Sequence, residues 1–239
     1  MPPTRRERGR TDRYHRMREQ VVDVAVELFS RNGYASTGVA DIGTAAGLAR
    51  GALYYYIGSK EALLAEIHDR VMDPLLAEAA AIADLDVSFQ ARLRLLSESL
   101  LWQIINRHDH VWVFLHEYRH LQGEQREDFR DKRQRFESHI HYVLADGQRR
   151  GLLQGQIRDL NLAMLAFLNL HNYTYQWLAG REKPRVEELS RFYCEIFFNG
   201  VVAKPVDQAA ADSELEHGRS VLEAVRATRR EAEAAFEDA

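Results

Sequence analysis

The residues whose types and spacing could perform chemistry form two short groups, and the first has the spacing of a zinc site. His116 and His120 flank Glu117 in the pattern H-E-x-x-H. On a helix this spacing puts two imidazoles one turn apart beside a carboxylate, as in zinc peptidases. Arg119 stands between the histidines, and its permanent positive charge opposes a bound Zn²⁺. We therefore expect no metal, no cofactor and no enzyme, and keep a zinc-dependent hydrolase as an alternative.

The second group lies in residues 37–61, and its side chains suit the groove of a DNA duplex. Arg50 can form two hydrogen bonds with a guanine edge or pair with a phosphate. The hydroxyls of Tyr54 and Tyr55 can reach phosphate oxygens without adding charge. These three residues are therefore candidate DNA contacts.

Small and capping residues complete this second group. Ala49 and Gly51 would allow a helix backbone to approach DNA closely. Ser59 caps a following helix, so Lys60 in its first turn, together with free backbone N–H groups, forms a phosphate anchor. Thr37 is the expected cap of the preceding helix and a further DNA contact, although no glutamate stands three residues later to complete a capping box.

The elements that must position these residues are two short helices joined by a tight turn. Apolar residues at positions 39, 42 and 46 predict one face of a first helix. Gly47 can adopt the left-handed conformation that a sharp turn requires. Leu53 and Ile57, four residues apart, predict the buried face of a second helix over residues 49–56.

The whole stretch carries the pattern T-x-V-x-D-I-x-x-x-A-G-L-x-x-G-x-L-Y-x-Y-x-x-S-K-E-x-L from Thr37 onward. This pattern resembles the N-terminal DNA-binding domain of TetR-family repressors. Gly38, Gly43 and Ile57 depart from it, where a threonine, an alanine and an aromatic residue are usual. Each glycine should weaken its helix by about 1 kcal/mol relative to alanine.

Helical periodicity continues through the chain, so we predict an all-α fold. We expect a disordered basic arm over residues 1–15 and a three-helix DNA-binding domain over 16–73, with the helix-turn-helix at 38–57. Residues 74–203 should form a helical ligand-binding and dimerisation domain. Pro74 either ends a helix or bends it. The acidic extension over 204–239 is expected to be a weakly amphipathic surface appendage or partly disordered.

Charge and cysteine content limit the classes of function. The net charge of −4 argues against a basic coat, yet residues 1–18 contain seven arginines and two acidic residues. This segment is either a solvated tail or an arm that follows phosphates or enters a minor groove. The single cysteine, Cys194, excludes an internal disulfide, and the charged N-terminus lacks a signal peptide. We expect a cytoplasmic protein without a membrane span.

The body contains many polar aromatic residues, which either pack in the core or line an apolar ligand cavity. The candidate ligand-binding residues are Trp102, Trp112, His116, Tyr118, Arg119, His120, Tyr142, Tyr175 and Trp177. The helix from Leu160 is apolar nearly all round, which predicts that one side faces its own core and the other a second subunit. The candidate dimer-interface residues are Leu168, Tyr173, Trp177, Phe197 and Phe198.

The family resemblance implies a homodimeric repressor that leaves a palindromic operator when a small molecule binds the body. Residues 113–150 and 172–177 resemble more narrowly the TetR-family regulators of fatty-acid and sterol breakdown, which sense acyl-CoA thioesters. Arg119, Arg126 and Arg130 are among the cations that could meet CoA phosphates, although a solvated helix face explains most of them. The sequence leaves open the operator, the ligand, and whether the ligand releases DNA or strengthens binding. A protein-binding adaptor with a degenerate DNA domain is a second alternative.

Overall fold

The computed structural model describes residues 5–155, 157–201 and 208–237, which form helices and turns without a β-strand. The all-α prediction is confirmed. The chain divides into two compact units. The first comprises Met1–Val71, Asp109–Phe129 and Ala227–Ala239, and the second comprises Met72–His108 and Arg130–Arg226. No helix within the described ranges is both long and apolar enough to cross a membrane.

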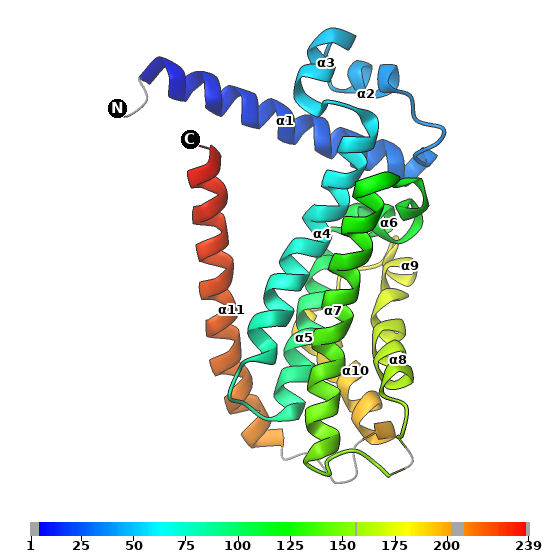
Figure 1. Ribbon diagram of the computed structural model, residues 1–239, viewed down its shortest axis with the longest axis vertical. Helices are drawn as coiled ribbons and strands as arrows, with labels where there is room; N and C mark the ends of the chain where they lie inside the picture. The colour runs from blue at the N-terminus through cyan, green and yellow to red at the C-terminus, as the bar shows by residue number, and fades with distance from the viewer. Residues whose placement is uncertain (1–4, 156, 202–207, 238–239) are drawn as a thin grey trace. The chain divides into compact units, whose positions relative to one another are not determined.

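The first unit is built on α1 (Arg5–Asn32), α2 (Val39–Ala45), α3 (Arg50–Ile57) and the beginning of α4 (Lys60–Ala83). Figure 1 shows α2 and α3 beside α1, and these three helices pack pairwise against one another. Gly33, with φ of 80°, follows the end of α1 in the left-handed conformation that commonly terminates a helix. The expected three-helix arrangement is therefore present.

The core of this unit also draws on a segment far away in the sequence. Val113 in α6 (His108–His116), Leu121 and Phe129 are buried in the same cluster as Phe29 and Leu53. Leu121 follows the short 3₁₀ helix η1 (Tyr118–His120), and Phe129 lies in the first turns of α7 (Gly123–Arg149). A three-helix domain alone has a marginal core, so this segment supplies apolar burial that residues 16–73 lack.

The second unit contains the later part of α4, most of α7, and five further helices. These are α5 (Phe89–Asn106), α8 (Leu160–Asn172), α9 (Thr174–Leu178), α10 (Val186–Val201) and, as far as Arg226, α11 (Gln208–Glu237). Ser88 caps α5, and Asp159 caps α8 by accepting from the backbone N–H groups of Asn161 and Leu162, at 2.9 and 3.1 Å. Serine and aspartate are among the residue types that favour the N-cap position.

Several helix boundaries differ from the predictions. The α1 helix begins at Arg5, so residues 5–15 are helical rather than disordered. The α4 helix continues through Pro74 to Ala83, so the proline does not end it. The H-E-x-x-H pattern, whose zinc reading requires one helix, is divided because α6 stops at His116. The helix from Leu160 ends at Asn172, before the short α9.

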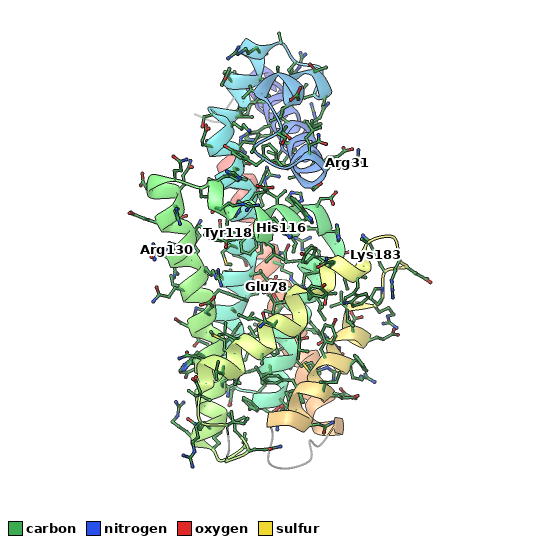
Figure 2. All side chains as sticks on the ribbon, turned by 90° about the vertical axis from the view of Figure 1, so that its right-hand side faces the viewer. Arg31, Glu78, His116, Tyr118, Arg130 and Lys183 are labelled. Carbon is green, nitrogen blue, oxygen red and sulfur yellow. The ribbon has the colours of Figure 1, made fainter. Side chains whose placement is uncertain are left out.

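The C-terminal extension is a helix bound to its own unit, which corrects the expected surface appendage. Leu215 and Leu222 of α11 are buried. Arg219 donates from Nε and Nη2 to the carboxylate of Glu98, at 2.9 and 2.6 Å. Arg226 makes a similar pair of bonds with Glu78, labelled in Figure 2, at 2.8 and 3.0 Å. These guanidinium groups compensate two buried carboxylates, which would otherwise be costly.

Candidate nucleic-acid interface

The turn between α2 and α3 fixes the angle at which α3 is presented. Gly47 has φ of 68°, as predicted, and the N–H of Leu48 donates to the carbonyl of Gly43 at 2.8 Å. A Cβ added to Gly43 would lie 3.0 Å from the carbonyl oxygen of Leu48. The glycine that departs from the family pattern therefore allows the turn to approach α2 closely.

One side of α3 is buried and the opposite side is exposed. Leu53 and Ile57 are buried, as predicted, and anchor α3 in the core. Ala49, Arg50 and Gly51 are exposed, as are Tyr54 at 37% and Tyr55 at 71%. Five of the seven predicted DNA contacts thus lie on the open side of one short helix.

The N-terminus of α3 has unused hydrogen-bond donors. Its N-cap residue is Ala49, whose side chain cannot accept a hydrogen bond. Backbone N–H groups in the first turn of a helix lack intrahelical partners and can bind phosphate. A Cβ built on Gly51 would meet no other atom within 4 Å, so the backbone is uncovered at this point.

Thr37 does not belong to this exposed surface, and its predicted capping role was wrong. The N-cap of α2 is Gly38, whose N–H donates to Oδ2 of Asp41 at 2.7 Å. Thr37 is 2% exposed, and its hydroxyl donates to the carbonyl of Gly33 at 2.9 Å. We expected no carboxylate three residues after the cap, because we placed the cap at Thr37. The helix begins one residue later, so the cap is Gly38 and Asp41 stands at the third position.

Lys60 lies at the start of α4, where Ser59 caps the helix by accepting from the N–H of Ala62 at 3.0 Å. Its Nζ donates to the carbonyl of Tyr34 at 2.6 Å and lies 4.0 Å from the centre of the Tyr34 ring. Burial lowers the pKa of Lys60, and nearby Glu61, Asp41 and Glu117 oppose this shift. The ammonium group is held in place by one bond, and its other N–H donors can meet a phosphate.

An aromatic cluster that the sequence reasoning missed joins α1 to the exposed side of α3. The ring of Tyr14 lies 5.3 Å from that of Tyr55 and 5.2 Å from that of Tyr56. Arg13 and Arg16 are exposed on either side of Tyr14. The cluster therefore fixes two exposed cations of α1 relative to α3.

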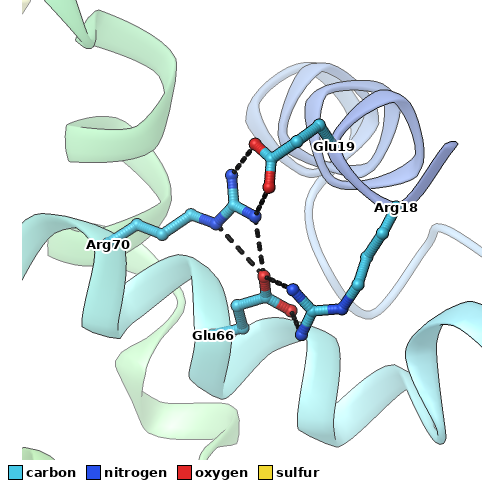
Figure 3. A network of polar contacts seen from close by, with 4 residues as sticks. All are labelled: Arg18, Glu19, Glu66 and Arg70. Atoms are coloured by element: carbon cyan, nitrogen blue, oxygen red, sulfur yellow. Dashed lines mark hydrogen bonds and ion pairs between the residues drawn. The ribbon is translucent and has the colours of Figure 1, made fainter. Parts of the chain in front are cut away.

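A network of ion pairs holds α1 against α4 (Figure 3). Arg18 donates to both oxygens of Glu66, at 2.8 and 2.7 Å. Arg70 donates to both oxygens of Glu19, at 2.6 Å each, and its Nη2 also bonds Glu66 at 2.7 Å. Paired guanidinium–carboxylate contacts fix orientation as well as contributing energy. This network therefore stabilises the packing of α1 on α4, the two helices that flank α3 in the chain.

The H-E-x-x-H residues do not share a helix. The α6 helix ends at His116, and the separate helix η1 begins at Tyr118 and ends at His120. His116 and Tyr118 are labelled in Figure 2. His116 stacks on Trp112, whereas His120 packs on Tyr34 and lies 3.3 Å from the buried Glu117 carboxylate. No group of three metal-binding side chains occurs in the described part of the chain. The geometry that a zinc hydrolase needs is therefore not formed by these residues.

The predicted ligand-binding residues fall into both units. Five of them belong to the first unit: Trp112, His116, Tyr118, Arg119 and His120. Four belong to the second unit: Trp102, Tyr142, Tyr175 and Trp177. Trp102 and Tyr142 are 40% and 50% exposed. The assignment of these nine residues to a ligand site therefore stays a prediction.

The predicted interface residues divide by burial. Leu168, Phe197 and Phe198 are at most 9% exposed. They pack inside the protomer and not, as we expected, on the helix sides that would face a second subunit. Tyr173 is 62% exposed and Trp177 is half-buried. The large apolar side chains that α8 and α10 expose are Leu162 at 64%, Leu165 at 41%, Phe192 at 57% and Ile196 at 48%.

Comparisons with known proteins agree with this geometry. Residues 21–67 match the family model described as "Bacterial regulatory proteins, tetR family". Residues 86–201 match the one described as "Tetracyclin repressor-like, C-terminal domain". The transcriptional repressor KstR2 of Rhodococcus jostii is 26% identical over 203 residues, which cover 84% of this chain and 97% of the relative.

Two solved structures have a similar fold. The TetR-family regulator PfmR of Thermus thermophilus superposes with a TM-score of 0.68 at 27% identity, over 75% of this chain and 97% of that one. The regulator FadR of Bacillus subtilis, solved with stearoyl-CoA, superposes with a TM-score of 0.61 at 23% identity, over 76% and 98%. The two family models, the helix-turn-helix pattern and the exposed α3 lead to one conclusion: the chain belongs to the TetR family of DNA-binding transcriptional regulators.

Proposed function

We propose that the protein is a homodimeric repressor that binds a palindromic operator and leaves it when a small molecule binds the helical body. The exposed side of α3 carries this proposal, because Arg50 lies at a helix N-terminus without a side-chain cap and Tyr54 and Tyr55 are exposed further along the same helix. Arg50 is assigned to base recognition, and Lys60 with the tyrosines to phosphate contacts. Arg13 and Arg16, positioned by Tyr14, extend the contact along the sugar–phosphate backbone of the DNA.

The exposed apolar residues of α8 and α10 support a dimer. Leu162, Leu165, Phe192 and Ile196 form an apolar set that a monomer would leave in water. Two helices from each of two protomers make a four-helix interface with two-fold symmetry. Such a dimer presents two copies of α3 to two half-sites of a palindrome.

The proposed effector class is an acyl-CoA thioester. KstR2 is named a repressor, and FadR was solved with stearoyl-CoA, so the fold accommodates such a ligand in one relative. Release requires that the ligand binds the DNA-incompetent arrangement more tightly than the DNA-bound one. A ligand that binds both arrangements equally would leave the operator occupied.

The test is a titration of the purified protein against DNA from its own upstream region at several salt concentrations, with and without a panel of acyl-CoA thioesters. We expect tight binding that weakens steeply with salt and is relieved by one thioester. Tight binding that no thioester relieves would contradict the effector class and leave the repressor intact. Failure to bind any DNA at low salt would contradict the DNA-binding function and favour the protein-binding adaptor.

A further inference from the structure

Lys60, the proposed phosphate anchor, is held by Tyr34 in two ways. Its Nζ donates to the carbonyl of Tyr34 at 2.6 Å and lies 4.0 Å from the centre of the Tyr34 ring. Hydrogen bonds and cation–ring contacts both depend on geometry. Tyr34 itself lies in the turn between α1 and α2 and not in a helix. The direction of the ammonium group therefore depends on what fixes Tyr34 in this turn.

Tyr34 is fixed by a residue that is distant in the sequence but belongs to the same compact unit. The Tyr34 ring lies 5.0 Å from the ring of His120, which ends η1, and 5.1 Å from the ring of Phe29. Tyr34 is only 7% exposed. Close packing leaves a buried ring little freedom, so His120 limits the positions that the Tyr34 ring can adopt.

Glu117 is the buried end of this chain of contacts. It is 4% exposed, and its carboxylate oxygen Oε2 lies 3.3 Å from Nε2 of His120. A Cβ built on Gly33 would lie 3.6 Å from Oε1, so the carboxylate is next to the residue that precedes Tyr34. Burial lowers the pKa of Lys60, and Glu117 is one of three carboxylates whose charge opposes this shift. Glu117 is therefore coupled to Lys60 by charge as well as through His120.

We propose that Glu117 and His120 are positioning residues for the phosphate contact of Lys60. His120 keeps the Tyr34 ring in place, and Tyr34 directs the ammonium group. Glu117 orients His120. This inference rests on the proposed DNA-binding function, and it adds two residues outside the segment 21–67 that matches the DNA-binding family model. The role is separate from the effector contact that the sequence predicts for His120.

The first test is a double-mutant cycle on the affinity for upstream DNA at three salt concentrations. Lys60→Ala should weaken binding by about tenfold in the wild-type protein but by only about threefold in His120→Ala, where the ammonium group is already misplaced. The slope of affinity against salt concentration should decrease in His120→Ala toward that of Lys60→Ala. Independent effects of the two substitutions, with an unchanged slope in His120→Ala, would show a merely structural role and overturn the proposal.

A conservative variant tests whether the ring of His120 is the feature that matters. His120→Phe keeps an aromatic ring against Tyr34, so it should bind DNA more tightly than His120→Ala and recover most of the dependence on Lys60. Equal affinities of the two variants would contradict ring packing as the means of positioning.

A matched pair of glutamates tests the carboxylate. Loss of one negative charge alone favours DNA binding. Glu117→Gln should nevertheless weaken binding by about threefold, because His120 loses its charged partner. Glu127→Gln removes the same charge from an exposed position of the same unit and should not weaken binding. If both substitutions tighten binding alike, Glu117 has no positioning role.

NMR relaxation of the full chain with ¹³C-labelled lysine, measured without DNA, separates this inference from the repressor hypothesis. The Cε group of Lys60 should be restricted in the wild-type protein and in His120→Phe, and more mobile in His120→Ala. Lys183, exposed in the second unit, is the internal control and should be equally mobile in all three proteins. This pattern in a protein that binds no DNA would contradict the repressor alone. Unchanged mobility of Lys60 in His120→Ala would overturn the positioning role.

Discussion

His68 and His171 are buried histidines, and both make stability depend on pH. Burial lowers the pKa of each to about 4 from an ordinary value of 6.5. Between these values the unfolded chain binds protons that the folded protein excludes, so stability falls as the pH decreases from 6.5 toward 4. Each histidine contributes at most about 3 kcal/mol to this change.

Urea unfolding at pH 7 and pH 5 measures this effect. The decrease in unfolding free energy should be smaller in His68→Gln and His171→Gln, and smallest in the double variant. An unchanged pH dependence in the double variant would show that other groups cause the acid sensitivity.

Arg50 and Lys60 should differ in the way that they affect DNA binding. Arg50→Ala should cost about 1–3 kcal/mol on the preferred operator and relax the preference at one base pair, because a base contact is lost. Lys60→Ala should weaken all sequences alike and reduce the salt slope by about 1. Affinities for the operator and for a one-base variant, measured at three salt concentrations, distinguish these outcomes. A Lys60→Ala protein with unchanged affinity would remove Lys60 from the interface.

At the scale of the element, a side chain at Gly51 should have opposite effects on the stability of α3 and on its binding to DNA. A Cβ at this position meets no atom within 4 Å, so Gly51→Ala should stabilise the protein by up to about 1 kcal/mol. The same methyl group projects from the side of α3 that we propose as the DNA-binding side, so operator affinity should decrease. Thermal unfolding and DNA titration of one variant test both effects. Increased stability with unchanged affinity would contradict the close approach at this residue.

Gly218 shows how closely α11 packs on α5. A Cβ at Gly218 would overlap Cδ1 of Leu95, which is fully buried. Gly218→Ala should therefore destabilise the second unit by about 1–3 kcal/mol. The control is Gly200→Ala in α10, where a Cβ meets no atom within 4 Å and helix propensity should improve. Chemical denaturation of both variants gives the comparison, and equal stability changes would contradict the packing of α11.

Local determinants explain which elements the sequence could predict. Gly47 and Asp159 act within a few residues of their own positions, so the turn and the cap follow from sequence alone. The end of α6 at His116 does not, because neither glycine nor proline follows it before Gly123, and the burial of Glu117 is a property of the folded unit. The fixation of α11 likewise depends on Arg219 and Glu98, which lie 121 residues apart. Burial of Leu168 rather than Leu162 was equally unpredictable, because a helix that is apolar all round has no periodic pattern to orient it.

At the scale of the whole molecule, the proposed dimer predicts which substitutions should separate the two protomers. Leu162→Glu and Ile196→Glu place charges in an apolar four-helix interface, so each should produce monomers. Operator affinity should fall as well, since one protomer reaches only one half-site. Sedimentation velocity and DNA titration provide the two measurements. Tyr142→Glu is the control, because Tyr142 is 50% exposed on α7, and a dimer that survives both α8 and α10 substitutions would contradict the interface.

The burial of Val113, Leu121 and Phe129 in the core around Phe29 affects how such a regulator can be recombined. A chimaeric regulator that joined residues 1–71 to the C-terminal domain of another protein would lack these apolar side chains in the core of its DNA-binding unit. The protein that donates residues 1–71 would also have to contribute residues 109–129, which belong to the same compact unit but are not adjacent to them in the sequence. We therefore expect successful head exchange, in evolution or in the laboratory, to require two coordinated crossovers or a recipient whose own segment has compatible apolar residues.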